Sequence, residues 1–418
     1  MKQILHGHIV HAPKLGALEI LENGYMLLEN GKIAGIAGAL PDDWKGCEII
    51  DYSDRIIMQS FCDMHLHAPQ YPMLGMGMDL PLLEWLNTYT FKTEARFADV
   101  DYAREIYRRL AKELIDNGTT RVCAFSSLHL ESTLVLMEEF EKAGICGFVG
   151  KVNMDRNGSP ELQENTEDSI RDTIKWLDAC PKDAHIQPIL TPRFTPSCTN
   201  ELMAALGKLA KERGLYVQSH LSENTSEIEW VRSLHPDCPQ YWESYDKYGL
   251  FNSHTVMAHC VHSDERERKA IKDHNVVVAH CPDSNINLIS GVAPIRQMLN
   301  EGIWITLGSD IAGGAVLPMM GVIAEAIRSS KVKRIGSNWT VDFLTVAEGY
   351  YLGTTSGAHY FGGGDGFATG DALHAVVIDD HKYVDTERLS VRERFERSFY
   401  RSNADDIKAV YSEGRKIK

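Results

Sequence analysis

The chain has 418 residues and a formal net charge of −15, from 43 Lys and Arg against 58 Asp and Glu. Because no basic cluster interrupts this acidic background, the chain would repel a phosphate backbone, and nucleic acid is excluded as an expected partner. The longest apolar stretches are strand-sized, well short of the roughly 20 residues that a membrane helix needs. The first ten residues lack the pattern of a signal peptide. We therefore expect a soluble, cytoplasmic protein without membrane contact.

The chain contains nine cysteines, which are scattered without a CxxC pair. This pattern argues against a disulfide framework and against a thiolate zinc finger. We expect reduced and mostly buried thiols.

Three segments follow one another along the chain. Residues 1–58 alternate short β-like runs with turns, as in GYMLLENGKIAGIAG, and predict the first part of a small β-domain. Residues 59–358 alternate apolar strands with amphipathic helices. Residues 359–418 are Gly-rich and then β-like, as in DALHAVVIDD, and predict the second part of the small domain, which we expect to be a β-sandwich.

The middle segment contains eight strand-and-helix units. Strands that alternate with helices indicate a parallel sheet, and eight such units can close into a (β/α)8 TIM barrel, an α/β fold. The eight expected strands, named by their sequences, are RIIMQSF with the residues up to His65, TTRVCAFSS, GFVGKVNM, AHIQPILTPRF, LYVQSHLSE, TVMAHCVH, VVVAHCP and WITLGSD.

Polar residues end five of these strands, and in such a barrel the active site lies at the carboxyl ends of the strands. In chain order they are His65 with His67, His220, His259, His280 and Asp310. Side chains two residues apart on a strand point to the same face, so His65 and His67 can share one ion. The HxH pair alone could equally be structural, but partners at four further strand ends favour a metal site.

Zinc prefers imidazole and carboxylate ligands, and a catalytic zinc keeps one position open for water. We predict that one zinc ion is held by His65, His67, His220 and Asp310. His280 fits a structural or substrate-adjacent position better. Asp63 is expected at most to support the ligands, and Lys151 is not on the strand where a metal-bridging lysine would be needed, so a mononuclear site is favoured.

Glu223 follows His220 by three residues, just beyond a strand end. A carboxyl at that position can act as general acid and base for the reacting water. The alternative is that Glu223 is a helix-start glutamate stabilised by the helix dipole. His259, on the next strand, can hydrogen-bond the attacking oxygen or stabilise charge on an intermediate.

These motifs resemble the amidohydrolase superfamily, and within it the guanine deaminases. The resemblance covers about residues 61–314 and consists of HLHAPQY, DLPLLEWLNTYTF, NGTTR, FVGKVNMD, LTPRFTPSC, QSHLSEN, MAHC, HCPDSNINLISG and LGSDIAGG, in the order expected.

The resemblance implies a distorted barrel, one zinc ion, a homodimer and hydrolysis of guanine to xanthine and ammonia. It implies that Gln70, Arg193 and Phe194 recognise the purine base, and we call these three residues the purine readers. The substrate site would also include His67, His220, Glu223 and Asp310, and the catalytic residues would be Glu223, His259 and Asp310. In the expected mechanism, water attacks C2 of guanine while Glu223 protonates the ring nitrogen and Asp310 accepts the proton of the water.

Two other readings remain open. The first is another hydrolase of the same superfamily, acting on a related base such as 8-oxoguanine or cytosine. The second is a non-catalytic scaffold that has kept the barrel, although no expected ligand is missing here. The unrelated zinc deaminases with a PCxxC signature are excluded, because the chain has no PCxxC.

Overall fold

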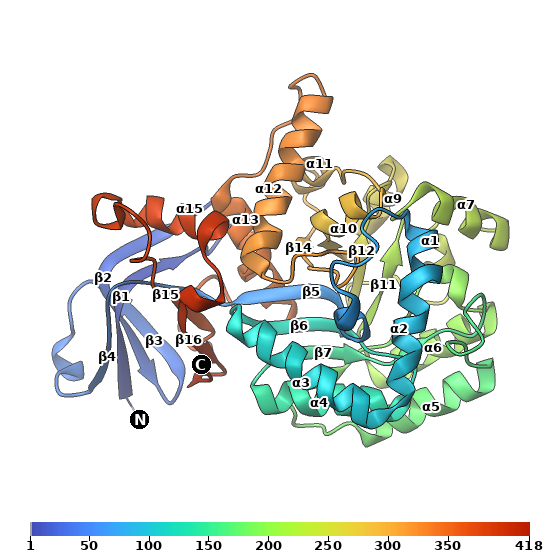
Figure 1. Ribbon diagram of the computed structural model, residues 1–418, viewed down its shortest axis with the longest axis horizontal. Coiled ribbons are helices and arrows are strands. Elements are labelled where there is room, and N and C mark those ends of the chain that lie inside the picture. The colour runs from blue at the N-terminus through green and yellow to red at the C-terminus, as the bar shows by residue number, and fades with distance from the viewer. Residues whose placement is uncertain (1) are drawn as a thin grey trace.

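Eight parallel strands form a barrel at the centre of the computed structural model, which describes residues 2–418 (Figure 1). Two four-stranded ladders make up the barrel, in the orders β5-β6-β7-β9 and β11-β12-β13-β14. The eight strands are β5 (Phe61–His67), β6 (Thr119–Phe125), β7 (Cys146–Gly150), β9 (Ile186–Pro188), β11 (Val217–Leu221), β12 (Thr255–His259), β13 (Val277–His280) and β14 (Ile305–Leu307). The predicted barrel is confirmed, but the start of its first strand differs from the prediction. Residues 55–59 of the run RIIMQSF belong to a strand outside the barrel, and the barrel strand begins at Phe61.

Main-chain hydrogen bonds bridge the two gaps between the ladders. At one seam, Gln218 N–H donates to the Leu190 carbonyl over 2.9 Å. At the other seam, Asp310 N–H donates to the His65 carbonyl over 2.8 Å, and His67 N–H donates to the Ile311 carbonyl over 2.9 Å. The second seam therefore joins two of the predicted site residues directly.

Most residues of the barrel strands are buried. Every residue of β5, β11, β12 and β13 is buried, as expected where helices and the barrel interior cover both faces of a parallel sheet. The third and fourth predicted strands are each interrupted: β8 (Val152–Asn153) follows β7, and β10 (Thr191–Pro192) follows β9. Pro188 and Pro192 end β9 and β10, and proline has no N–H to continue a ladder.

Helices connect the strands and close the chain. They are α1 (Leu82–Trp85), α2 (Phe91–Ala95), α3 (Val100–Asp116), α4 (Leu130–Ala143), α5 (Thr166–Ala179), α6 (Asn200–Arg213), α7 (Thr225–Leu234), α8 (Glu243–Asp246), α9 (Glu265–Asp273), α10 (Pro282–Asn287), α11 (Ile295–Asn300), α12 (Met319–Gly336), α13 (Val346–Gly353), α14 (Thr355–Tyr360) and α15 (Val391–Arg401). Among the described residues 2–418, no helix has the length and apolar character to cross a membrane.

Local sequence sets several of the helix ends. The side chain of Asp99 accepts hydrogen bonds from the N–H groups of Asp101 and Tyr102 and so caps the start of α3. Helices α4 and α6 end at Gly144 and Gly214, whose φ angles of 82° and 64° lie in the left-handed region that glycine enters without steric cost.

Both ends of the chain build one seven-stranded sheet, on the left of Figure 1. Its order is β17-β16-β15-β4-β1-β2-β3, from β1 (Lys2–His11), β2 (Glu19–Glu29), β3 (Lys32–Ala37), β4 (Glu48–Gln59), β15 (Ala375–Ile378), β16 (Ile407–Ser412) and β17 (Arg415–Lys416). The expected β-sandwich is thus hydrogen-bonded as a single sheet, and apolar side chains from β1 to β4, β15 and β16 share one cluster. The domain boundaries at residues 58 and 359 stay predictions.

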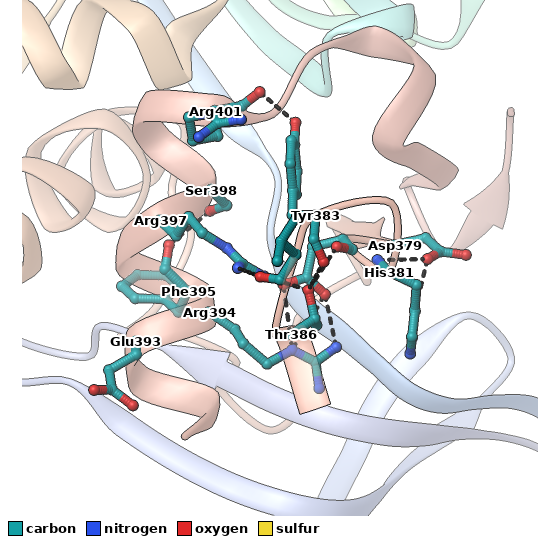
Figure 2. A network of polar contacts seen from close by, with 12 residues as sticks. Asp379, His381, Tyr383, Thr386, Glu393, Arg394, Phe395, Arg397, Ser398 and Arg401 are labelled. Carbon is teal, nitrogen blue, oxygen red and sulfur yellow. Dashed lines mark hydrogen bonds and ion pairs between the residues drawn. The ribbon is translucent and has the colours of Figure 1, made fainter. Parts of the chain in front are cut away.

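A buried ion-pair network attaches α15 to this sheet. Figure 2 shows Arg394 and Arg397 extending from α15 toward the segment that carries Tyr383 and Thr386. Arg394 Nη2 donates to Asp380 over 2.7 Å, and Arg397 Nη2 donates to the second oxygen of Asp380 over 2.8 Å. Burial alone would raise the pKa of Asp380, but the two arginines outweigh it and lower that pKa.

We expect Arg394→Gln to reduce the free energy of unfolding by about 3 kcal/mol, because it removes one partner of a carboxylate that is 1% exposed. Thermal unfolding followed by circular dichroism checks this. The matched control is Arg392→Gln on the exposed face of the same helix, where a pair with Glu396 at 3.3 Å is worth little. Equal midpoints for the two variants would contradict the assignment.

The pH dependence of this difference has a defined sign. A carboxylate whose folded pKa is lowered stabilises the fold above its unfolded pKa of about 3.9, and that contribution is lost as the pH falls. The difference between the Arg394→Gln variant and the unsubstituted protein is therefore expected to shrink below about pH 4.

Candidate metal centre

Four histidines and one aspartate meet at the carboxyl ends of the barrel strands. His67 Nε2 lies 3.1 Å from His220 Nε2, and His65 Nε2 lies 3.3 Å from Asp310 Oδ1. Asp310 Oδ1 is 3.7 Å from His67 Nε2, while Asp310 Oδ2 is 3.8 Å from His259 Nε2. All five side chains are buried. The structure therefore brings together all four residues that the sequence predicted as ligands, with His259 beside them.

The donor atoms of this group suit a metal ion. Those of His65, His67 and His220 lie within 4.8 Å of one another, and so do those of His65, His259 and Asp310. His65 Nε2 is buried and has no hydrogen-bond partner, which is costly unless an ion completes the site. Burial lowers the pKa of His67 and of His220 well below the ordinary value, so both rings are neutral and can each offer a lone pair. The residues present fit a cation bound by nitrogen and oxygen.

Neighbouring groups orient the candidate ligands from outside. His220 Nδ1 lies 2.5 Å from the Arg193 carbonyl oxygen, so with Nδ1 protonated the ring turns Nε2 toward the centre of the group. The Tyr245 hydroxyl donates to the His220 carbonyl over 2.8 Å. Asp63 accepts hydrogen bonds from the N–H groups of Ser309 and His65, at 2.9 and 3.3 Å. Asp63 thus holds the backbone at the seam, and burial raises its pKa to about 6.

Glu223 points into the same site and is not used to start a helix. Its Oε2 lies 3.5 Å from His259 Nε2, and Ser290 Oγ donates to its Oε1 over 3.2 Å. Burial, together with the negative charge of Asp310, raises the pKa of Glu223 to about 8. The capping role at α7 belongs instead to Glu227, which forms a capping box with Asn224 and accepts the Glu223 N–H over 2.9 Å.

The backbone at three strand ends adopts conformations that are uncommon for residues other than glycine. Ser222, His259 and Asp310 have φ angles of 46°, 74° and 48°. Such left-handed positions cost free energy and are found where the surrounding structure holds them in place, often at functional sites. Here they turn the chain sharply where the site residues leave their strands.

A cavity opens onto the metal-binding group. Gln70, Arg193 and Phe194, the predicted purine readers, are buried and line this cavity together with the site residues. The remaining walls are largely apolar and come from Leu82, Trp85, Leu86 and Leu288. A mostly apolar pocket with a few fixed polar groups is typical of small-molecule sites.

Two other residues considered as metal ligands, Lys151 and His280, lie outside the metal-binding group. Lys151 is fully buried and pairs with Glu164 over 2.6 Å, so it does not reach the metal-binding group. His280 is 1% exposed, and it belongs to none of the metal-binding groups in the described part of the chain. Burial lowers its pKa to about 3, so its ring is neutral.

A second group of potential ligands lies between the barrel and the terminal sheet. It consists of Cys146, His374 and Glu413. His374 is hydrogen-bonded at both ring nitrogens, to Thr120 Oγ1 and to Glu413 Oε1, each at 3.0 Å, and the Cys146 thiol donates to the Thr120 carbonyl. Since each of these donor atoms has a protein partner, the group serves to join the two parts of the fold.

Several residues that support the site were not assigned from the sequence. Asn285 Oδ1 lies 3.0 Å from His259 Nδ1, and Glu94 contacts both Gln70 and Arg193. Asn285 and Ser290 lie within the motif HCPDSNINLISG, but the motif by itself assigns no role to either residue. Glu94 lies beyond the motif DLPLLEWLNTYTF, and no local pattern marks it.

A closed (β/α)8 barrel with a buried His and Asp metal-binding group and a carboxyl beside it defines a metal-dependent hydrolase. Comparison with known proteins agrees, because the model of the amidohydrolase family matches residues 56–416. The chain belongs to the amidohydrolase family.

Three known proteins illustrate the similarity. Guanine deaminase from Dictyostelium discoideum is 35% identical, over 100% of this chain and 98% of its own. Guanine deaminase from Mus musculus is 39% identical, over 86% of this chain and 82% of its own. A crystal structure of guanine deaminase from C. acetobutylicum, with guanine bound in the active site, is 44% identical, with a TM-score of 0.98 and full coverage of both chains.

We expect His220→Asn to lower the bound metal at least tenfold from about one ion per chain, because it removes a nitrogen ligand. Elemental analysis of the purified protein measures this. His280→Asn is the matched control, since His280 is also buried, at the end of β13 in the same ladder, but lies outside the group. Metal loss in the control alone would place the ion elsewhere.

Proposed function

We propose that this protein catalyses the hydrolytic deamination of guanine, giving xanthine and ammonia. One observation carries the proposal: a single cavity joins the metal-binding group to Gln70, Arg193 and Phe194. The full-length similarity to guanine deaminases, including a structure with guanine bound, supports it.

Zinc is the metal that we propose for the site, held by His65, His67, His220 and Asp310. Three imidazoles and one carboxylate match the ligands of catalytic zinc, which keeps one coordination position open. Zinc bound in this way activates water for attack at neutral pH.

The protein residues around the reacting carbon have separable roles. Glu223 is close enough to the group to take one proton of the attacking water and deliver it to the ring nitrogen beside C2. His259 Nδ1 donates to Asn285 Oδ1, and its Nε2 faces both Glu223 and Asp310. With both ring nitrogens protonated, Nε2 can donate to the oxygen that attacks C2. Asp310 would accept the second proton, from the oxygen added at C2, and this proton would pass to the amino group, which leaves as ammonia. Addition of one water and loss of one ammonia balance the reaction.

The base is bound by the other end of the cavity. Arg193 has only N–H donors, which suit the acceptors O6 and N7 on the edge of guanine remote from C2. The Gln70 amide can both donate and accept. The ring of Phe194, 8% exposed, offers an apolar face for the purine.

The purified protein is expected to convert guanine to xanthine, seen as a change in ultraviolet absorption. We expect it to deaminate adenine, cytosine and 8-oxoguanine at least a hundredfold more slowly. Zinc content is determined on the same sample. Turnover of one of the other bases in preference to guanine would keep the hydrolase and overturn the assignment of Gln70, Arg193 and Phe194 as guanine readers.

Glu223→Gln is expected to retain zinc and to lower kcat by about 10³, because the amide keeps the shape of the side chain but transfers no proton. Steady-state kinetics and elemental analysis measure the two effects. Glu229→Gln, on the exposed side of α7, is the control and should behave like the unsubstituted protein. A Glu223→Gln variant with near-normal turnover would remove Glu223 from the mechanism.

A homodimer is proposed as the working assembly. Val332 and Ile335, near the end of α12, are 54% and 60% exposed, and Trp339, three residues beyond this helix, is 66% exposed. The end of α12 projects from the top of the molecule in Figure 1. Exposed apolar residues in such a group are typical of protein contacts. Sedimentation equilibrium checks the assembly, and a monomeric mass at micromolar concentration would refute it. A cytoplasmic location stays a prediction.

A further inference from the structure

We propose that Glu94 is a positioning residue that holds Arg193 and Gln70 in the orientation needed to read the oxygen-bearing edge of the base. This inference rests on the proposed function and assigns its selectivity to a residue outside the cavity.

Glu94 connects the two polar readers by three hydrogen bonds. Arg193 Nη1 donates to Glu94 Oε2 over 2.6 Å, and Arg193 Nη2 donates to Glu94 Oε1 over 3.0 Å. Gln70 Nε2 donates to the same Oε1 over 2.8 Å. The three residues are 2 to 3% exposed. A carboxylate bound on both oxygens by a guanidinium forms one of the more directional polar contacts in proteins.

The position of Glu94 relative to the cavity shows that it acts through its partners. Gln70 and Arg193 line the cavity, whereas Glu94 is absent from the cavity wall and lies behind them. Further contacts hold the readers from other sides. The Ala312 N–H donates to Gln70 Oε1 over 3.0 Å, and the Arg193 guanidinium lies 5.4 Å from the Phe91 ring centre. These bonds also fix which end of the Gln70 amide carries the N–H groups.

The negative charge of Glu94 is required by the burial of Arg193. A guanidinium without a partner in a cavity with largely apolar walls would be strongly unfavourable, so it would turn away or draw in water. Paired through one N–H of each terminal nitrogen, Arg193 keeps its remaining N–H groups free for the cavity. The pair therefore presents donors of fixed direction.

Fixed donors discriminate between purines. O6 and N7 of guanine accept hydrogen bonds, while an amino group at C6, as in adenine, would place donor against donor. A guanidinium that could rotate would relieve this repulsion. Because Glu94 prevents the rotation, it contributes to selectivity without touching the base.

Glu94 also connects Arg193 to the chain segment that forms one wall of the cavity. It belongs to α2, in the same segment as Leu82, Trp85 and Leu86, which line the cavity. The ion pair with Arg193, which follows β10, attaches this segment to the barrel.

The test uses binding and does not depend on turnover. Hypoxanthine keeps O6 but lacks the amino group at C2, and purine lacks both, so calorimetry with the zinc-loaded protein isolates the contact to O6. Glu94→Gln keeps the shape and removes the charge. We expect this substitution to weaken the binding of hypoxanthine about 10- to 100-fold and the binding of purine by less than about threefold. The control is Glu84→Gln, at an exposed position of the same segment, which should change neither.

Two further variants sharpen the result. Glu94→Asp keeps the charge but is too short to reach both partners, so an intermediate effect is expected. In an Arg193→Gln background, Glu94→Gln should add nothing, because the two act as one unit. Should Glu94→Gln fail to fold, Glu94→Asp supplies the same comparison of ligands.

The outcomes separate this inference from the proposed function. Equal weakening of hypoxanthine and purine, or no change in either, would overturn the role of Glu94. Failure of the unsubstituted protein to deaminate guanine would overturn the proposed function. In that case, a selective loss of hypoxanthine binding in Glu94→Gln would still support Glu94 as the positioning residue.

Discussion

The hydrogen bond from Asp310 N–H to the His65 carbonyl closes the barrel, and the site depends on that closure. In a parallel barrel all carboxyl strand ends lie on one rim, so side chains from distant parts of the chain can meet there. Asp63 stabilises this seam by accepting hydrogen bonds from the N–H groups of Ser309 and His65. A shift of this seam would separate the carboxylate of Asp310 from the imidazoles of β5.

Buried carboxylates organise the site, and their environments separate their roles. Asp310 is surrounded by imidazoles, and its pKa is lowered despite burial. Glu223 lies near a hydroxyl and an imidazole, but burial and the negative charge of Asp310 dominate, and its pKa is raised. Glu227 holds the backbone at Glu223, and Glu94 holds the arginine at the far wall. Carboxylates in this site thus have different roles because their surroundings differ.

The fold and the centre of the site were predictable, because short-range patterns report them. Alternation of strands and helices revealed the barrel, and the polar strand ends revealed His65, His67, His220 and Asp310. The arrangement of the terminal sheet was harder to predict from the sequence. Its strands come from both ends of the chain, and local patterns do not tell whether they join as one sheet or two.

The sequence alone determined which chemical groups are available and on which strands they lie, because side-chain periodicity and strand order are local properties. Only the tertiary structure decided which groups act together. Glu94 contacts Gln70 and Arg193 across long stretches of chain, and Glu227 rather than Glu223 starts α7. Such contacts depend on how the connecting segments pack against the barrel, and that packing is a sum of many weak contacts that no short motif records.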